Sequence, residues 1–170
     1  MPKRMLGAAL APLIAAMPAA AQRTLTMGVQ TPPSALDPHF HNTTNNTMML
    51  MQIYERLFEL DNRAVPQPRL ATSMRAIDEL TWEVKLRPGV RFHDGTPLDA
   101  DDAVFSILRA QQPTSSFSSI AQALGTPVRI DAQTLELRLA APNPLLLDYL
   151  AGVLVMNRRW AEGHGSAQVP

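Results

Sequence analysis

One histidine and four aspartates lie within residues 91–106, RFHDGTPLDADDAVFS, and such side chains serve elsewhere as metal ligands or as acids and bases. A zinc site needs three or four ligands, but His93 and Asp94 are chain neighbours whose side chains point apart. A calcium loop needs oxygens at alternate positions around a glycine, and the three later aspartates lack both features. The stretch therefore indicates no metal site and no catalytic residue.

Helix chemistry explains those three aspartates. Asp99 is well placed as an N-cap, and Asp101 and Asp102 then fall in the first turn, where the helix dipole favours carboxylates. We predict a helix over 99–110. Its expected apolar face consists of Val104, Ile107 and Leu108.

The elements that surround this helix follow from two hydrophobic periods. Residues 81–87 and 134–140 alternate strictly between apolar and polar side chains, and each follows a short polar turn, which predicts two antiparallel hairpins. Residues 47–58 carry apolar side chains at helical spacing, which predicts a helix there. We expect a mixed α/β fold (α+β), with a further strand at 24–29, a short helix within 142–155 and a loop at 161–170.

The N-terminus has the organisation of an export signal. Lys3 and Arg4 precede an apolar run over 5–17, and the alanines at 19–21 fit the A-x-A rule of signal peptidase. The run is too short to span a bilayer comfortably. We expect residues 1–21 to be a cleavable signal peptide and the mature protein to be periplasmic.

Charge and cysteine content exclude several classes of function. The chain has 15 basic and 15 acidic residues, and loss of Lys3 and Arg4 leaves a slight acidic excess, which gives no electrostatic case for nucleic acid or anionic membrane. The sequence contains no cysteine, which excludes disulfides, zinc–thiolate sites, thiol nucleophiles and a lipidated cysteine.

The stretch at 92–106 also belongs to a series of short motifs. The others are LDPH at 36–39, YERL at 54–57, PRLATSM at 68–74, TWEVKLRPGV at 81–90 and PNPLL at 142–146. In this order, over about 24–160, they resemble the family 5 bacterial extracellular solute-binding proteins, the peptide- and nickel-type binding components of ABC importers.

The resemblance implies a two-lobed clamp of the periplasmic-binding-protein type (type II, cluster C). Such a clamp closes on a solute and delivers it to a membrane permease driven by a separate ATPase; it is not an enzyme, and no cofactor is implied. Residues 22–170 would supply the first strand of one lobe and most of an accessory subdomain, with antiparallel hairpins and flanking helices. Family members are far longer, so we expect this chain to be a truncated N-terminal part.

The resemblance also directs attention to the loop over 39–47, because the corresponding loop commonly faces the solute. The candidate ligand-binding residues are Asn42, Thr43, Thr44, Asn45 and Asn46. His39 and His41 suggest nickel, but they form an i, i+2 pair without further ligands, so we predict no metal site.

Three functions remain open at this point. The first is solute binding, with peptide as the family's commonest class and nickel, opines, glutathione, haem and sugars as alternatives. The second is a non-binding remnant, in which the apolar residues 145–147 and 153–155 would be exposed. The third, a periplasmic hydrolase, is weak because the sequence has neither a G-x-S-x-G nor an H-E-x-x-H motif.

Overall fold

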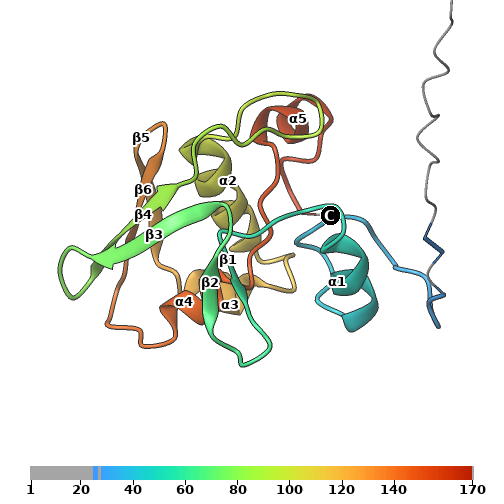
Figure 1. Cartoon of the computed structure of the whole chain (residues 1–170), viewed down its shortest axis with the longest axis horizontal. Coiled ribbons are helices and arrows are strands. Elements are labelled where there is room, and N and C mark those ends of the chain that lie inside the picture. The colour runs from blue at the N-terminus through green and yellow to red at the C-terminus, as the bar shows by residue number, and fades with distance from the viewer. Residues whose placement is uncertain (1–24, 27, 170) are drawn as a thin grey trace, which may run out of the picture.

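A four-stranded antiparallel sheet forms the centre of the molecule, and helix α2 packs on one of its faces (Figure 1). The computed structural model describes residues 25–26 and 28–169. Its elements are α1 (Thr44–Leu50), β1 (Phe58–Leu60), β2 (Pro66–Pro68), β3 (Ala71–Ala76), β4 (Thr81–Leu86), α2 (Ala100–Ala110), α3 (Ser118–Gln122), β5 (Thr126–Asp131), β6 (Thr134–Arg138), α4 (Leu146–Leu150) and α5 (Arg158–Gly163). The predicted mixed α/β class is confirmed.

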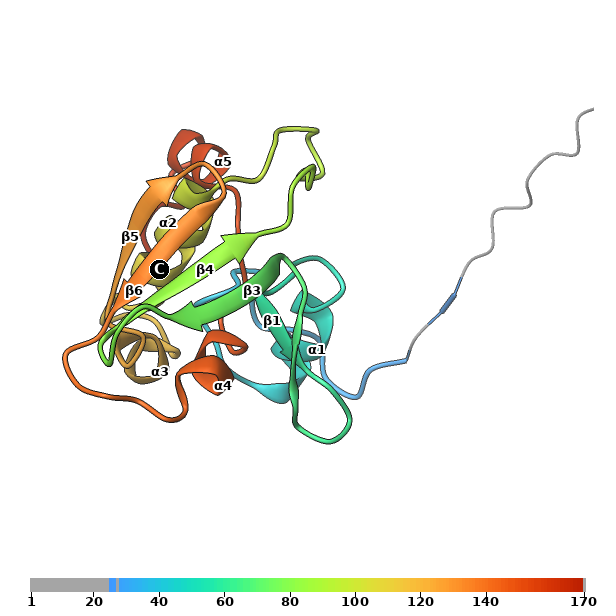
Figure 2. The ribbon, with the colours of Figure 1, turned by 60° about the vertical axis from the view of Figure 1, so that its left-hand side comes forward.

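The sheet consists of the two predicted hairpins joined side by side, in the order β3-β4-β6-β5 (Figure 2). In the β3–β4 turn, the Asp78 carboxylate accepts hydrogen bonds from the backbone N–H groups of Leu80 and Thr81 at 2.8 and 2.7 Å. In the β5–β6 turn, Asp131 accepts in the same way from Gln133 at 2.7 Å. Both hairpins are therefore closed by local side-chain chemistry that the sequence displays.

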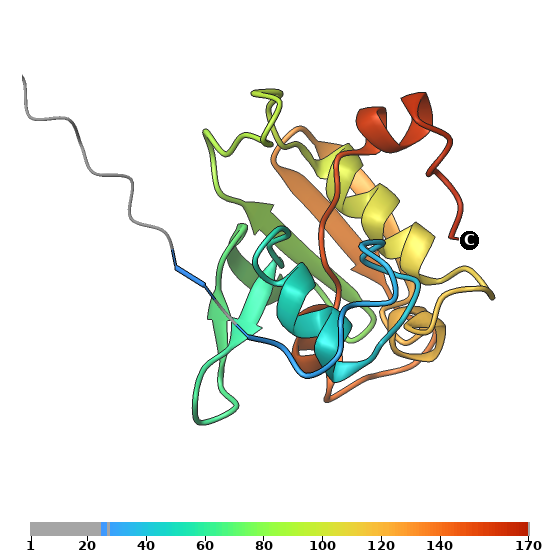
Figure 3. The same ribbon diagram turned by 90° about the vertical axis from the view of Figure 1, so that its right-hand side faces the viewer.

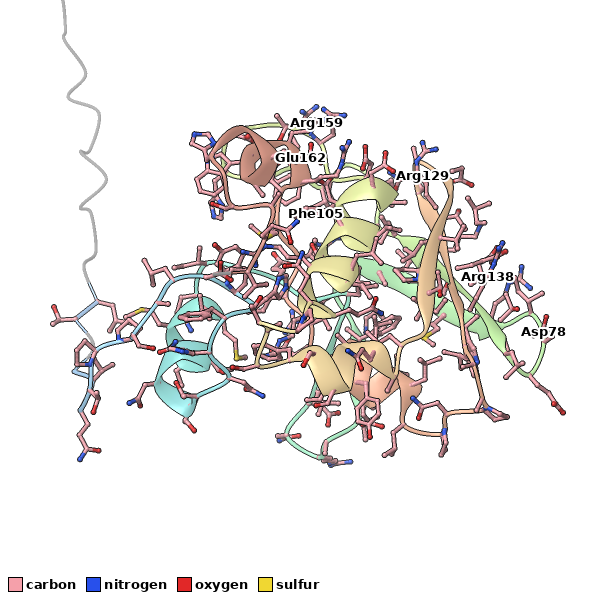
Figure 4. All side chains as sticks on the ribbon, turned by 180° about the vertical axis from the view of Figure 1, so that it is seen from behind. Asp78, Phe105, Arg129, Arg138, Arg159 and Glu162 are labelled. Carbon is pink, nitrogen blue, oxygen red and sulfur yellow. The ribbon has the colours of Figure 1, made fainter. Side chains whose placement is uncertain are left out.

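The alternation of the strands separates the two faces of the sheet. Val84 and Leu86 of β4 and Leu135 and Leu137 of β6 are buried on the face toward α2. Figure 4 shows charged side chains at the outside of the sheet. They include Asp78 in the β3–β4 turn, Arg129 on β5 and Arg138 on β6.

Helix α2 begins as predicted. The Asp99 side chain accepts hydrogen bonds from the backbone N–H groups of Asp101 and Asp102, and the Asp102 carboxylate in turn accepts from the Asp99 N–H at 3.1 Å. This reciprocal arrangement is a capping box and satisfies N–H groups that the helix itself leaves free.

The face that α2 presents to the sheet is narrower than the sequence predicts. Ala100, Ala103, Ile107 and Ala110 are buried, whereas the side chain of Leu108 is 47% exposed. Small alanines let the helix approach the sheet closely, so Leu108 is not needed for the core. Its placement on the apolar face was wrong.

Helix α1 is shorter than predicted and starts earlier, ending at Leu50 instead of residue 58. Beyond it, the backbone pairs with distant segments: the Glu55 carbonyl accepts from the Val155 N–H at 2.8 Å, and Arg56 forms a bridge with Leu154. Leu57 is buried as the sequence pattern suggests, but in a bend just before β1 and not in a helix. Long-range backbone pairing competes successfully with a weak local preference for helix.

The predicted strand at 24–29 is not formed in its described residues, which are 25, 26, 28 and 29. Leu25 is 82% exposed and Val29 is 51% exposed. A strand needs a neighbour for its backbone hydrogen bonds, and this segment leads away from the body of the molecule (Figure 3).

Two expectations for the C-terminal part were also wrong. Residues 161–170 were expected to form a loop, but α5 extends to Gly163. The run 153–155 was expected to be exposed, yet all three of its residues are buried, as is Leu146; Leu145 alone of that group is strongly exposed, at 49%. Most apolar side chains of this C-terminal part are thus buried within the described chain. Among the described residues, no helix is long and apolar enough to cross a membrane.

A prediction about folding concerns Gly125, which joins α3 to β5 with a φ of +70°. A Cβ at this position would lie 2.2 Å from the Arg138 carbonyl oxygen, whereas a Cβ at Gly89, with a φ of +75°, would meet no described atom within 4 Å. We expect Gly89→Ala to cost about 1 kcal/mol of unfolding free energy, from its conformation alone. Gly125→Ala should cost about 2 kcal/mol more, because the β6 backbone must move.

Urea unfolding of both variants measures the difference. Equal costs would show that the backbone around Gly125 adjusts freely and that the close approach to β6 has no energetic weight.

Candidate functional site

The predicted ligand-binding residues lie at the start of α1. Thr43 is the N-cap of this helix, and Asn42, Thr43, Thr44 and Asn45 are exposed. Within the part of the chain that the structure describes, the Thr43 side chain makes no capping hydrogen bond. This turn therefore presents amide and hydroxyl groups to its surroundings.

Asn46 differs from its four neighbours because it is buried, at 1% exposure. Its Oδ1 accepts from the Ser34 N–H at 3.0 Å, and its Nδ2 donates to the Ser34 hydroxyl at 3.1 Å. The same hydroxyl is hydrogen-bonded to Nδ1 of His41 at 2.7 Å. Asn46 thus holds the segment before α1 against the helix, and its amide is used within the chain.

A buried arginine, Arg109, binds the residues that lead into this loop. Arg109, in the last turn of α2, is 1% exposed and makes five hydrogen bonds through its guanidinium group. Nη1 and Nη2 donate to the two carboxylate oxygens of Asp37 at 2.8 and 2.5 Å, and Nη1 also donates to Nδ1 of His39 at 3.1 Å. Nε and Nη2 donate to the carbonyls of Ser166 and Gln168, each at 2.9 Å.

His39 in this cluster is held in its neutral form. Nδ1 accepts from Arg109, so Nε2 carries the proton and donates to the Leu154 carbonyl at 2.9 Å. Burial lowers the pKa of His39 from 6.5 to about 4, and the positive charge of Arg109 acts in the same direction. Burial would raise the pKa of Asp37, but the Arg109 hydrogen bond and further contacts outweigh it and hold that pKa below 3.8.

The cluster of Asp37, His39 and Arg109 has the residue types of an acid–base site, but a solute cannot reach its histidine. The ring nitrogens of His39 are both engaged, and the residue is 1% exposed, so a solute cannot reach either of them. His41, the other predicted nickel candidate, stacks on Phe40 with 3.9 Å between ring centroids. Among the described residues, no group of three or more histidine, cysteine, aspartate or glutamate side chains is placed to hold a metal.

A cavity of about 590 Å³ lies at the other end of α1. Its walls come from residues 51–55 after the helix, from the loop around 90–94 and from the approach to α5. They include the partly exposed apolar side chains of Met51, Ile53 and Trp160. Its size suits a small ligand. Sequence reasoning missed this cavity, because its walls are far apart in the chain.

Sequence reasoning also missed the polar face of α2. Asp102, Ser106 and Arg109 are all buried and fall at i, i+4 and i+7, one stripe of a helix. The Ser106 hydroxyl accepts from the Met156 N–H at 3.0 Å, and the Asp102 carboxylate accepts from the Arg158 N–H at 2.9 Å. Polar residues at helical spacing were the available signal, but the sequence did not show which backbone they would bind.

The chain is similar to known bacterial solute-binding proteins. The family model for bacterial extracellular solute-binding proteins, family 5, matches residues 65–165. The glutathione-binding protein GsiB of Salmonella paratyphi A is 29% identical over 145 residues, which is 84% of this chain and 28% of GsiB. The chain therefore spans little more than a quarter of the length of this relative.

Two solved structures of solute-binding proteins are also similar to this chain. The solute-binding protein MoaA of A. tumefaciens R10, in complex with mannopinic acid, is 30% identical with a TM-score of 0.72; the match covers 79% of this chain and 29% of MoaA. The ABC transporter substrate-binding protein CtaP of Listeria monocytogenes is 25% identical with a TM-score of 0.69, over 80% of this chain and 28% of CtaP.

The neutral state of His39 predicts a pH dependence of stability. Its folded pKa of about 4 lies below the ordinary value of 6.5, so between these values the unfolded chain binds more protons and stability falls as the pH falls. We expect a loss of about 3 kcal/mol of unfolding free energy between pH 7 and pH 4 from this residue. Asp37 adds a loss only at lower pH, as the pH falls from its unfolded pKa through its depressed folded pKa.

Urea unfolding at several pH values tests this. His39→Gln should remove the loss between pH 6.5 and 4, while His164→Gln, at an exposed position, should retain it. A His39→Gln variant with the same slope as the parent chain would assign the loss to other groups.

A second prediction separates Asn46 from Asn45. Asn46→Ala removes the side-chain hydrogen bonds to Ser34 and should cost about 1–3 kcal/mol of unfolding free energy. Asn45→Ala, at an exposed position of the same helical turn, should change it by less than about 0.5 kcal/mol. Thermal unfolding of the two variants in parallel checks the contrast, and similar losses would contradict the assigned role of Asn46.

Proposed function

Because this chain belongs to family 5 of the bacterial extracellular solute-binding proteins, we propose that it acts in the substrate-binding component of an ABC importer. The observation that carries the proposal is the family match over residues 65–165, in a fold with a TM-score of 0.69 to an ABC transporter substrate-binding protein. Proteins of this family bind solutes and are not enzymes. The partners of the intact component are a membrane permease and its ATPase, to which the solute is delivered.

Small peptides are the proposed solute class. The relative named for glutathione binding aligns with 84% of this chain, and glutathione is a tripeptide. A second candidate class, opines, is favoured by the 30% identity to the structure that holds mannopinic acid. Both classes are small polar acids, so a surface of amide and hydroxyl groups is suited to either.

The proposed solute contacts are Asn42, Thr43, Thr44 and Asn45, with Asn46 positioning them. Exposure of the first four residues leaves their polar groups available for hydrogen bonds. The loop that leads to them is fixed by the ion pair of Asp37 with Arg109. A contact surface held rigidly in advance loses less entropy when it binds.

The proposed location is the periplasm. The family is extracellular, which supports export of the protein. The proposed signal peptide, residues 1–21, lies outside the residues that the structure describes. N-terminal sequencing of the exported protein, with a mature end near residue 22, tests this part of the proposal.

Solute binding is testable by NMR titration of the ¹⁵N-labelled chain with glutathione and, separately, with mannopinic acid. In a two-lobed clamp this chain supplies part of the contacts. If it supplies half of the roughly −8 kcal/mol of a micromolar site, a dissociation constant of about 1 mM is expected. The side-chain amide signals of Asn42 and Asn45 should shift in a saturable way with the true solute. The solute that gives saturation identifies the class.

Matched variants localise the contact. Asn45→Ala should weaken binding about two- to tenfold through the loss of one hydrogen bond. Asn62→Ala, an exposed asparagine in the turn between β1 and β2, should leave it unchanged. Saturable shifts elsewhere with none at residues 42–45 would remove these residues from the site, and binding below about 10 μM would show that this chain alone carries it.

A further inference from the structure

A second cavity, of about 330 Å³, lies beside the larger one and shares Met51, Tyr54 and Glu55 with it. Its character is different because its walls carry charged side chains. They are Glu55, Arg56, Glu59, Arg69 and Arg87. Three cations and two anions leave this small space with one excess positive charge.

The pairing inside the cavity shows where that excess lies. Arg69 forms an ion pair with Glu59, and Arg87 lies 3.7 Å from the carboxylate of Glu55. Arg56 is left over: its Nε is buried and has no hydrogen-bond partner among the described residues. Burial lowers the pKa of Arg56, while Glu59 opposes that effect. Burial disfavours the charge of this guanidinium, and an anion bound in the cavity would offset that cost.

The backbone behind the arginines is fixed by hydrogen bonds. The Arg56 carbonyl accepts from the Leu70 N–H at 3.1 Å, and Arg56 forms a bridge with Leu154. The Arg87 N–H donates to the Leu70 carbonyl at 2.7 Å, and the Arg69 N–H donates to the Leu57 carbonyl at 3.0 Å. Three separate segments thus bring their arginines together on one rigid framework, which favours ligand binding.

We propose that this cavity binds the carboxylate of a small organic acid, with Arg56 as its principal partner. The planar guanidinium fork matches a carboxylate. A carboxylate neutralises the single excess charge, whereas a dianionic phosphate would reverse it. The neighbouring 590 Å³ cavity, with Met51, Ile53 and Trp160 in its walls, accepts an apolar body attached to that carboxylate.

This site is distinct from the polar turn at residues 42–45. It lies past the end of α1 at Leu50, whereas that turn lies at the helix start. The inference does not depend on a role in import, so its failure would leave the proposed function intact.

The test uses phenylacetate, a monoanion with an apolar ring, and phenylacetamide, which has the same ring without the charge. In the ¹⁵N-labelled chain at constant ionic strength, the Arg56 Nε–H signal should shift and saturate at millimolar phenylacetate. Phenylacetamide should produce no saturable shift there, and inorganic phosphate should bind at least threefold more weakly than phenylacetate. Equal responses to phenylacetamide, or phosphate binding as tight as phenylacetate, would overturn the carboxylate assignment.

Variants assign the contact to Arg56. Arg56→Gln should weaken phenylacetate binding at least fivefold. Arg87→Gln should weaken it about twofold, and this variant tests the site if Arg56→Gln does not fold. Glu55→Gln, which raises the excess charge by one, should tighten binding about two- to fivefold. Arg75→Gln, on strand β3 in an exposed pair with Glu83, is the matched control and should change nothing. Unchanged binding in both Arg56→Gln and Arg87→Gln would refute the proposal.

Discussion

The guanidinium group of Arg109 is the interaction on which the arrangement of the described chain depends. It is buried, and its five hydrogen bonds reach Asp37, His39, Ser166 and Gln168. Burying a charge is expensive, and its attraction to Asp37 offsets that cost only because every N–H of the guanidinium has an acceptor. Loss of one partner would leave an uncompensated charge, so the cluster fixes position more than it adds stability.

This constraint explains why α2 is buried on two sides. One side, with Ala103 and Ile107, packs on the sheet through apolar contacts. The other, with Asp102, Ser106 and Arg109, binds the backbone of the chain before and after α5, which runs along the helix in Figure 3. At Met156, Arg158, Ser166 and Gln168, side chains of α2 satisfy backbone groups that lie outside the strands of the described chain. A central helix with a polar face thereby joins the sheet to both ends of the described chain.

The difference between local and long-range causes decides what the sequence could predict. The Asp99 cap and the turns at Asp78 and Asp131 were predictable, because each depends on residues within three positions of one another. The end of α1 at Leu50 was not, since Glu55 pairs with Val155, one hundred positions away. The same applies to the candidate site: the family resemblance and polar side chains made residues 42–46 candidates, but only the contact with Ser34 shows that Asn46 faces inward.

Helix α1 separates two surfaces of different chemistry. Its start carries neutral amides and hydroxyls at Asn42–Asn45, and beyond Met51 lies a cationic cavity around Arg56. A helix of seven residues is about 10 Å long, so its two ends are not adjacent. Neutral amides and hydroxyls both donate and accept hydrogen bonds, whereas guanidinium groups only donate and favour a negative charge. The two surfaces therefore select for different chemical groups, and the outcome of a binding test at one does not decide the other.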